Sequence, residues 1–250
     1  MEDLAELLFA LASVDRLTLL STIAKERLRL TQLASRLSAS TQETSRHLSR
    51  LEEAKLIQRE PDGCFIPTSL GRSFVALLPS LKVLTQHREY FLSHDLSTLP
   101  LEFLERIGEL EQCEFRHGIG GVLNHTADVF RGAKRFVWLS SDNVMDLNIL
   151  GRREVNQNVP LRIVIPAEAV RGVSSEMSRA GFGEKVELKI VDGVCAGLAL
   201  NEKRAGVTLP GPGGKLDFNS GFGGDDPKFQ KWCADLFIFH WNKAKSGQEA

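Results

Sequence analysis

Two consecutive helical patterns and a tight turn, all within residues 31–67, constrain this chain more than any other feature. Thr31 to Leu37 and Thr41 to Lys55 both space their apolar side chains as a helix does, and Ser38 to Ser40 lies between them as a turn. The inward face of the second helix is predicted to consist of Thr44, Leu48 and Leu51. This pattern predicts a helix-turn-helix with a polar outer face.

A β-hairpin is predicted immediately after the second helix. Pro61-Asp62-Gly63 is a strong turn signal, and short apolar stretches flank it at Leu56-Ile57 and Cys64 to Pro67. Two further helical patterns precede residue 31, over Leu4 to Leu11 and Leu17 to Ala24. Helices followed by a hairpin in this order predict a winged helix-turn-helix domain over residues 1–75.

A leucine-rich stripe follows the hairpin. Its residues are spaced four, three, four and three positions apart, as in a heptad, and they are Leu70, Phe74, Leu77, Leu81 and Leu84. Pro79 should kink this helix or restart it. We expect residues 76–100 to connect two domains and the stripe to form a homodimer.

Strand-like and helical segments alternate from residue 101 to residue 250. The predicted strands include Phe136 to Leu139, Leu161 to Ile165 and Val186 to Ile190, with helices at 120–131, 144–157 and 167–180. Cys195 to Leu200 and Ala205 to Leu209 suggest an antiparallel hairpin at the sheet edge, and a final helix starts at Pro227. The fold class is therefore α+β to α/β, with a sensor-like C-terminal domain built on a mixed sheet.

Composition excludes several other classes of protein. Hydrophobic residues make up 42% and charged residues 25% of the chain, and no apolar run approaches the roughly 18 residues that span a membrane. Four scattered cysteines without a CxxC pair are typical of reduced thiols, and the acidic N-terminus lacks a basic leader. We therefore expect a cytoplasmic protein with no membrane partner.

Double-stranded DNA is the predicted partner of the first domain. The residues expected to contact DNA are Ser40, Thr41, Gln42, Thr44, Ser45, Arg46, Arg50 and, on the hairpin, Arg59. The net charge of −1 and the equal numbers of acidic and basic residues in 1–74 supply no overall attraction to nucleic acid. A module that binds only other proteins is the alternative.

The N-terminal segments resemble the winged helices of the ArsR and MarR type of transcription regulator. The similar stretches are Val14 to Leu20, Leu30 to Ala34, Gln42 to Glu52, Glu53 to Ile57 and Thr68 to Gly71. Thr31 to Leu37 contains no cysteine, so the resemblance does not extend to the thiolate metal sensors of that group. It implies a sequence-specific DNA-binding regulator.

The C-terminal part is similar to the corresponding domain of archaeal regulators of the methanogenesis regulatory protein family. The similar stretches are Gly197 to Val207, Asp217 to Asn219 and Lys231 to Phe237. The resemblance implies a ligand-responsive archaeal repressor or activator and does not identify the ligand.

A small-molecule effector is expected to bind near the ends of the predicted strands. The candidate effector residues are Ser140, Ser141, Asp142, Asn143, Glu202 and Arg204. Helix capping by residues 140–143 and a solvated ion pair between Glu202 and Arg204 are the more frequent roles of such residues. The three tryptophans are expected to belong to the core.

Catalysis is not expected. None of the six histidines has a lysine two positions later, which phospholipase-type phosphodiesterases require, and both GxSxG and GxxxxGK[ST] are missing. Cys113 and His117 would share one face of a helix, but two ligands do not complete a metal site. The sequence therefore predicts no cofactor, no metal and no enzyme activity, with a phosphodiesterase as the less favoured alternative. Asn219 to Gly223 is expected to be a loop.

Overall fold

The computed structural model describes residues 1–142, 158–170 and 185–246. The chain divides into two compact units, Met1–Pro79 and Ser80–Ala250. The predicted helix at 144–157, most of the one at 167–180 and the candidate residue Asn143 lie outside the described residues. Only Ala167–Ala169 of the second of these helices is described, as the short helix η2.

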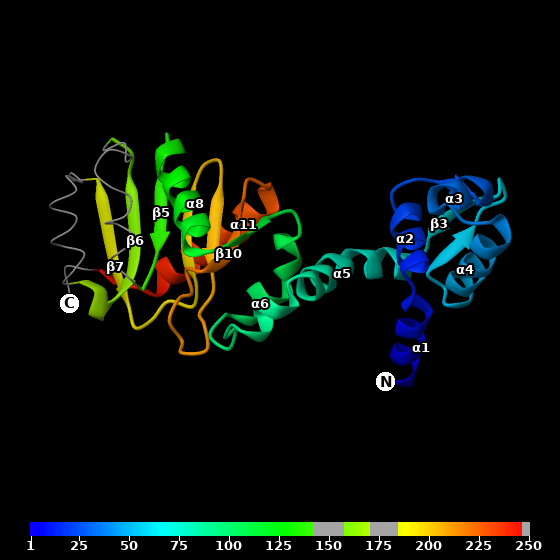
Figure 1. Ribbon diagram of the computed structural model, residues 1–250, viewed down its shortest axis with the longest axis horizontal. Coiled ribbons are helices and arrows are strands. Elements are labelled where there is room, and N and C mark those ends of the chain that lie inside the picture. Colours follow the sequence, from blue (N-terminus) through cyan, green and yellow to red (C-terminus); the bar gives the residue numbers. More distant parts are fainter. Residues whose placement is uncertain (143–157, 171–184, 247–250) are drawn as a thin grey trace. The chain divides into compact units, whose positions relative to one another are not determined.

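Helices form most of the first unit (Figure 1). They are α1 (Glu2–Leu11), α2 (Val14–Ile23), α3 (Leu30–Leu37) and α4 (Thr41–Glu53). Leu20, Leu33 and Leu51 are fully buried where α2, α3 and α4 meet, so burial of their apolar faces holds the three helices together. The helix α4 ends at Glu53 rather than at Lys55, because Lys55 adopts a left-handed backbone conformation with φ 58°.

The predicted hairpin is present. Its strands are β2 (Ile57–Arg59) and β3 (Cys64–Pro67), which pair antiparallel with Ile57 opposite Pro67. A short strand that the sequence did not predict, β1 (Leu28–Arg29), pairs with the other side of β3. The hairpin is thereby the wing of a winged helix-turn-helix.

The helix α5 (Ser69–Gln86) follows the wing, and the boundary between the two units falls within it. The helix does not restart at Pro79, because it continues through this residue. At its start the Thr68 hydroxyl donates to the Lys55 carbonyl at 2.6 Å and accepts from the Gly71 N–H at 3.1 Å. These two bonds attach the first turn of α5 to the end of α4.

An eight-stranded mixed sheet occupies the described part of the second unit, in the order β11-β7-β6-β5-β8-β9-β10-β4. The strands are β4 (Glu114–His117), β5 (Val137–Ser140), β6 (Leu161–Pro166), β7 (Val186–Val191), β8 (Gly197–Asn201), β9 (Ala205–Thr208), β10 (Ser220–Gly224) and β11 (Lys245–Ser246). The strands β5, β6 and β7 are mutually parallel, and β8, β9, β10 and β4 follow antiparallel.

One long helix covers each face of this sheet. Ala199 of β8 packs with Val129 and Phe130 of α8 (Ile119–Gly132), whereas Leu198 and Leu200 pack with α11 (Pro227–Lys243). The other helices in the described part of this unit include α6 (Arg88–Leu92), α7 (Leu101–Glu105) and η1 (Ile107–Leu110).

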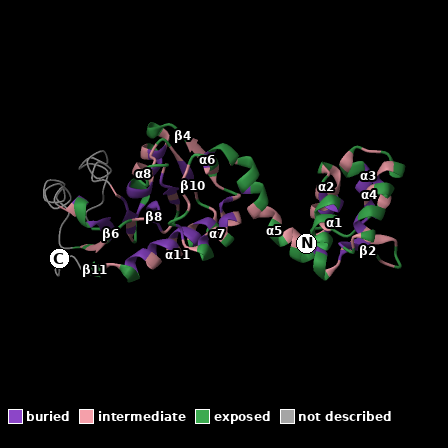
Figure 2. Ribbon diagram, turned by 90° about the horizontal axis from the view of Figure 1, so that it is seen from below, coloured by how far each residue is buried: buried purple, intermediate pink, exposed green. Residues whose placement is uncertain are grey.

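The core of the second unit contains the tryptophans, as expected. Trp232 is fully buried and its indole N–H donates to the Phe103 carbonyl at 3.0 Å, while Trp241 is 8% exposed. Trp138 is half-buried and stacks on Phe237 with ring centroids 5.0 Å apart. Buried residues follow one another along α11 (Figure 2).

Three local predictions are wrong. The hairpin β8–β9 lies inside the sheet and not at its edge, because β5 pairs with β8 and β10 pairs with β9. Residues Ser220 to Gly223, expected as a loop, belong to β10, whose glycines permit close strand packing. Cys113 and His117 do not share a helix face, because residues 114–117 form β4.

Gly71 generates a testable prediction about the first unit. A Cβ at this position would lie 1.9 Å from the Leu56 carbonyl oxygen, a backbone atom that cannot move aside without disturbing the wing. We expect Gly71→Ala to lower the free energy of unfolding by about 1–3 kcal/mol, measured by urea unfolding with far-ultraviolet circular dichroism. Gly120→Ala, where no atom lies within 4 Å, is the control, and equal stability of both variants would contradict the prediction.

Candidate nucleic-acid interface and effector cavities

The turn between α3 and α4 fixes where the second helix begins. Ser38 adopts a left-handed conformation with φ 54°, which ends α3. Ser40 caps α4, because its hydroxyl oxygen accepts the Glu43 backbone N–H at 3.1 Å. Thr41 is therefore the first residue of α4, as the sequence predicted.

The outer face of α4 carries most of the predicted DNA-contacting side chains. Ser40 and, on α4, Thr41, Gln42, Ser45, Arg46 and Arg50 are exposed. Thr44 is a correction. It is fully buried, and its hydroxyl donates to the Ser40 carbonyl at 2.9 Å, so it holds the helix start and cannot reach a ligand.

The two arginines of α4 differ in their surroundings. The Arg50 guanidinium lies 3.1 Å from a Glu53 carboxylate oxygen and 5.8 Å from the centre of the Phe9 ring. Arg46 makes no ion pair within residues 1–79, all of which the structure describes. Arg46 is thus the freer of the two to bind an anion.

The tip of the wing is a tight turn held by Asp62. Its carboxylate accepts the Cys64 backbone N–H at 3.0 Å and forms an ion pair with Arg27 at 3.2 Å. The hydrogen bond from Cys64, followed by the charge of Arg27, lowers the pKa of Asp62. Arg59 at the end of β2 is exposed, with its guanidinium 5.8 Å from the Phe65 ring centre.

The heptad stripe of α5 is largely open to solvent. Leu70 is 44% exposed, Leu77 59%, Leu81 52% and Leu84 36%, whereas Phe74 is half-buried against the core of the first unit. Single exposed leucines are ordinary, but four along one helix form an apolar face. Within the described residues, this face is available for contact with another chain.

In the second unit, an open cavity of about 1030 Å³ lies where β5, β6 and β7 end. Its charged or titratable lining residues include Asp142, Glu168, Asp192, Lys215, His240 and Lys243. Ligands of parallel sheets bind at the carboxyl ends of the strands, near the point where the direction of strand order changes. Here that point is β5, because β6 and β7 lie on one side of it and β8 lies on the other. Asp142 additionally accepts the Leu216 backbone N–H at 2.9 Å, which fastens one rim of the cavity.

Two lining residues of this cavity, Cys195 and His240, belong to a buried hydrogen-bond chain. The Cys195 sulfur lies 3.0 Å from His240 Nε2, and His240 Nδ1 lies 3.3 Å from the Ser140 hydroxyl, which donates to the Ala196 carbonyl. Burial raises the pKa of Cys195 to about 11 and lowers that of His240 to about 4. At neutral pH the thiol therefore donates to a neutral imidazole, and this pair is no activated nucleophile.

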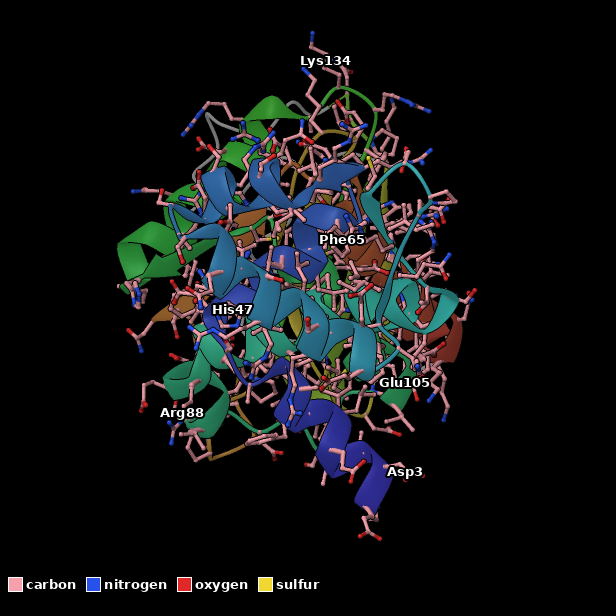
Figure 3. All side chains as sticks on the ribbon, turned by 90° about the vertical axis from the view of Figure 1, so that its right-hand side faces the viewer. Asp3, His47, Phe65, Arg88, Glu105 and Lys134 are labelled. Atoms are coloured by element: carbon pink, nitrogen blue, oxygen red, sulfur yellow. The ribbon has the colours of Figure 1, made fainter. Side chains whose placement is uncertain are left out.

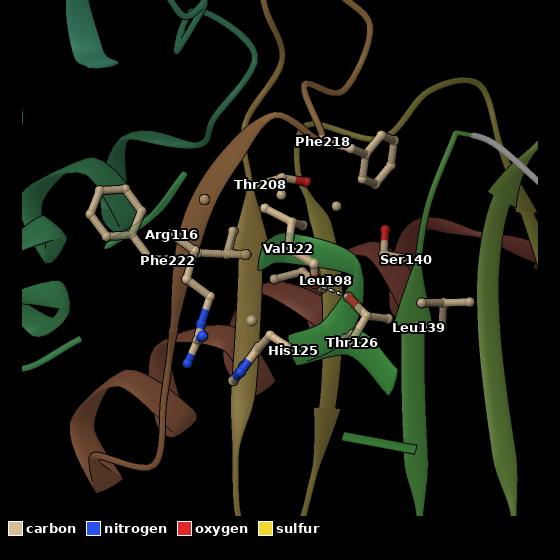
Figure 4. Close-up of a pocket in the computed structure, with 15 residues that line it drawn as sticks. Arg116, Val122, His125, Thr126, Leu139, Ser140, Leu198, Thr208, Phe218 and Phe222 are labelled. Atoms are coloured by element: carbon tan, nitrogen blue, oxygen red, sulfur yellow. Dashed lines mark hydrogen bonds between the residues drawn. The ribbon is translucent and has the colours of Figure 1, made fainter. Parts of the chain in front are cut away.

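A second, smaller cavity of about 30 Å³ lies between α8 and the sheet (Figure 4). His125 Nε2 donates to the Ala205 carbonyl at 2.8 Å, which leaves the buried Nδ1 as an unpaired acceptor, and the buried Thr208 hydroxyl is also unpaired. Gly206 and Gly223 leave room for the imidazole, since a Cβ on either would lie within 3 Å of it. A water molecule needs about 10–15 Å³, so this cavity has the size of about two waters and not of a metabolite.

The remaining effector candidates have structural contacts. Ser140 and Ser141 are each 1% exposed, and Ser140 lines the small cavity rather than the large one. The Glu202 carboxylate accepts the backbone N–H groups of Lys134 and Arg135 at 2.9 and 3.2 Å. Burial raises its pKa, but these donors and its own N–H outweigh burial and leave the pKa lowered. Arg204 pairs with Asp128 at 3.7 Å.

Sequence reasoning missed Cys195, His240 and Lys243 of the large cavity. His240 and Lys243 come from α11 and Cys195 from the turn before β8, and only the sheet brings these segments together. No local pattern signals such an arrangement.

Solved structures similar to the chain include three of different kinds. TrmBL2, described as an archaeal chromatin protein with a novel mode of DNA binding, is 15% identical, with 89% of each chain covered and a TM-score of 0.42. HlyU from Vibrio cholerae is 27% identical over 36% of this chain and 90% of its own, with a TM-score of 0.28. Nuc, a phospholipase D family member from Salmonella typhimurium, is 13% identical over 54% of this chain and 98% of its own, with a TM-score of 0.38.

No protein-family model matches the sequence, and no curated protein matches it. Similarities with TM-scores below 0.5 do not support the assignment of a function. A functional proposal for this chain must therefore be argued from its own sites. Among the described residues, no helix is long and apolar enough to cross a membrane.

His240 generates a prediction about pH. An unfolded histidine binds a proton near pH 6.5 and folded His240 only near pH 4, so the unfolded state takes up the proton first and stability falls as pH falls through this window. The loss should reach about 2 kcal/mol by pH 5, measured by urea unfolding with tryptophan fluorescence. His240→Gln should weaken this dependence, with a remainder from buried His125, whose pKa is also lowered, whereas exposed His117→Gln should keep it in full. Identical profiles for all three proteins would refute the assignment.

Proposed function

We propose that the chain is a sequence-specific DNA-binding regulator of transcription that acts as a homodimer and responds to a small polar effector. The observation that carries the proposal is the solvent-facing polar surface of α4, which begins at a capped helix N-terminus beside a wing. The major groove of DNA admits one α-helix, and the first turns of such a helix reach the base edges.

The side chains of α4 suit this role in different ways. Gln42 offers an amide that matches adenine, and Arg46 offers a guanidinium that matches guanine. Ser40 and Thr41 lie at the N-terminal end, where the helix dipole favours a phosphate. Arg59 on the wing would contact the backbone beside the groove. Arg50 is assigned a weaker role, because DNA must compete with Glu53 for it.

We propose that two copies pair through the leucines of α5. Binding of two half-sites, about one helical turn apart, requires a two-fold symmetric protein, and an isologous contact uses the same apolar face from each copy. Leu70, Leu77, Leu81 and Leu84 supply such a face on one continuous helix.

The cavity at the carboxyl ends of β5, β6 and β7 is the proposed effector site. Its volume is that of a small-molecule site, and acidic, basic and imidazole groups on its wall favour a polar ligand. The ligand would regulate DNA binding by favouring one of two arrangements of the protein. The helix α5 contains residues of both units and is the covalent path between them.

The DNA proposal predicts the effect of Arg46→Ala. Loss of a bidentate base contact costs about 1–3 kcal/mol, so affinity for a duplex selected from a random pool should fall about tenfold or more, measured by fluorescence anisotropy. Arg50→Ala should weaken binding less. The control is Arg88→Ala, an equal change of charge in the second unit. Equal affinity of the Arg46 and Arg88 variants would show that Arg46 does not read DNA, whereas a wild-type protein that selects no duplex would favour a protein-binding module.

The dimer proposal predicts the effect of Leu77→Glu with Leu81→Glu. Two carboxylates in an apolar interface cannot be solvated, so the wild-type dimer should become a monomer in light scattering at micromolar concentration. Leu101→Glu, a change at a 66%-exposed leucine of α7, should leave the dimer intact. A monomeric wild-type protein would remove the dimer from the proposal.

A further inference from the structure

Three metal-ligating side chains meet on the outside of the first unit. Asp15 lies in the first turn of α2, and Glu43 and His47 lie on α4; one ligand atom from each is within 4.8 Å of the others. Asp15 Oδ2 is 3.5 Å from His47 Nε2. Figure 3 labels His47 among the side chains of this unit.

The fold holds these residues together on rigid elements. Glu43 and His47 are four residues apart, so they share one face of α4. Buried Leu19 and Leu20 of α2 and buried Leu48 of α4 belong to one core, which fixes the two helices against each other. The cluster therefore does not depend on a flexible loop.

No lysine or arginine of residues 1–79, all of which the structure describes, forms an ion pair with the cluster. Within residues 1–79, all described, Asp15 has only the imidazole of His47 as an ionic partner, and Glu43 has none. The other ion-paired carboxylates of this unit face arginines, in the pairs Glu26–Arg36, Glu53–Arg50 and Asp62–Arg27. Two carboxylates that converge with an imidazole, and that pair with no lysine or arginine of residues 1–79, favour a bound metal cation.

We infer that Asp15, Glu43 and His47 bind one divalent transition-metal ion. One imidazole nitrogen and two carboxylate oxygens suit Mn²⁺, Fe²⁺ or Zn²⁺ better than Mg²⁺ or Ca²⁺, which prefer oxygen alone. Ligand atoms about 2.0–2.2 Å from a metal lie roughly 3–4 Å apart, so small side-chain rotations close the site. Water would complete the coordination.

The location of the site gives it a consequence for DNA binding, and this step rests on the proposed function. The ion adds two positive charges on the same helix as Gln42 and Arg46 and joins the start of α2 to α4. The added positive charge attracts DNA phosphates, and the link to α2 holds α4 in place, so both effects favour DNA binding by α4. The metal should therefore raise DNA affinity and steepen its dependence on salt.

Calorimetry of the tag-free, EDTA-treated full chain with Mn²⁺ and with Zn²⁺ tests the site without DNA. We expect one ion per chain, and an affinity at least tenfold lower in each of Asp15→Asn, Glu43→Gln and His47→Gln. Glu52→Gln, on α4 but outside the cluster, should bind as the wild type does. Circular dichroism checks that every variant is folded. Absence of saturable binding, or equal affinity of all variants, overturns the proposal.

Anisotropy with and without the metal then tests the consequence. The wild type should bind the selected duplex several-fold more tightly with metal than with EDTA, and His47→Gln should lose this difference. Equal affinity in both conditions overturns the regulatory step. Failure to bind DNA at all would contradict the proposed function, while the calorimetric result would still decide the metal site.

Discussion

The orientation of α4 depends on one buried layer, and the proposed nucleic-acid face depends on that orientation. Leu33, Leu48 and Leu51 are at most 1% exposed, and the hydroxyl of the fully buried Thr44 donates to the Ser40 carbonyl. Because side chains on a helix repeat every 3.6 residues, burying Thr44, Leu48 and Leu51 leaves Gln42, Ser45, Arg46 and Ser49 outward. The same packing aims Glu43 and His47 sideways toward α2, so the metal cluster and the polar face follow from a single constraint.

Local patterns in the sequence were sufficient for the helices and hairpin of the first unit, though not for its short strand β1, and for the parallel strands of the second. The period of α4, the Pro61-Asp62-Gly63 turn and the apolar runs of β5, β6 and β7 are all signals carried by neighbouring residues. The failures involve distant pairing. Ser220 to Gly224 lacks a strand pattern because three of its five residues are glycine, and only pairing with β9 and β4 makes it a strand. The interior position of β9 likewise depends on its pairing with β10, which the sequence did not predict.

Side-chain roles were less predictable than elements, because neighbours decide them. Thr44 and Arg46 are both polar residues of one helix, yet one is fully buried and the other is exposed. Glu202 was a candidate for ligand contact and instead holds the chain before β5 through two backbone donors. Glu43 and His47 lie four residues apart in the sequence, but Asp15, the third residue of the cluster, comes from another helix. No spacing within a local segment predicts that the three meet.

The two ends of the large sheet have a further consequence for the behaviour of the protein. One outer strand, β11, has two residues, and the other, β4, is the four-residue sequence Glu114-Phe115-Arg116-His117. Short, charged outer strands offer few free backbone groups to a neighbouring molecule, and natural proteins use such strands to avoid edge-to-edge aggregation of their sheets. Association of copies through the edges of this sheet is therefore disfavoured.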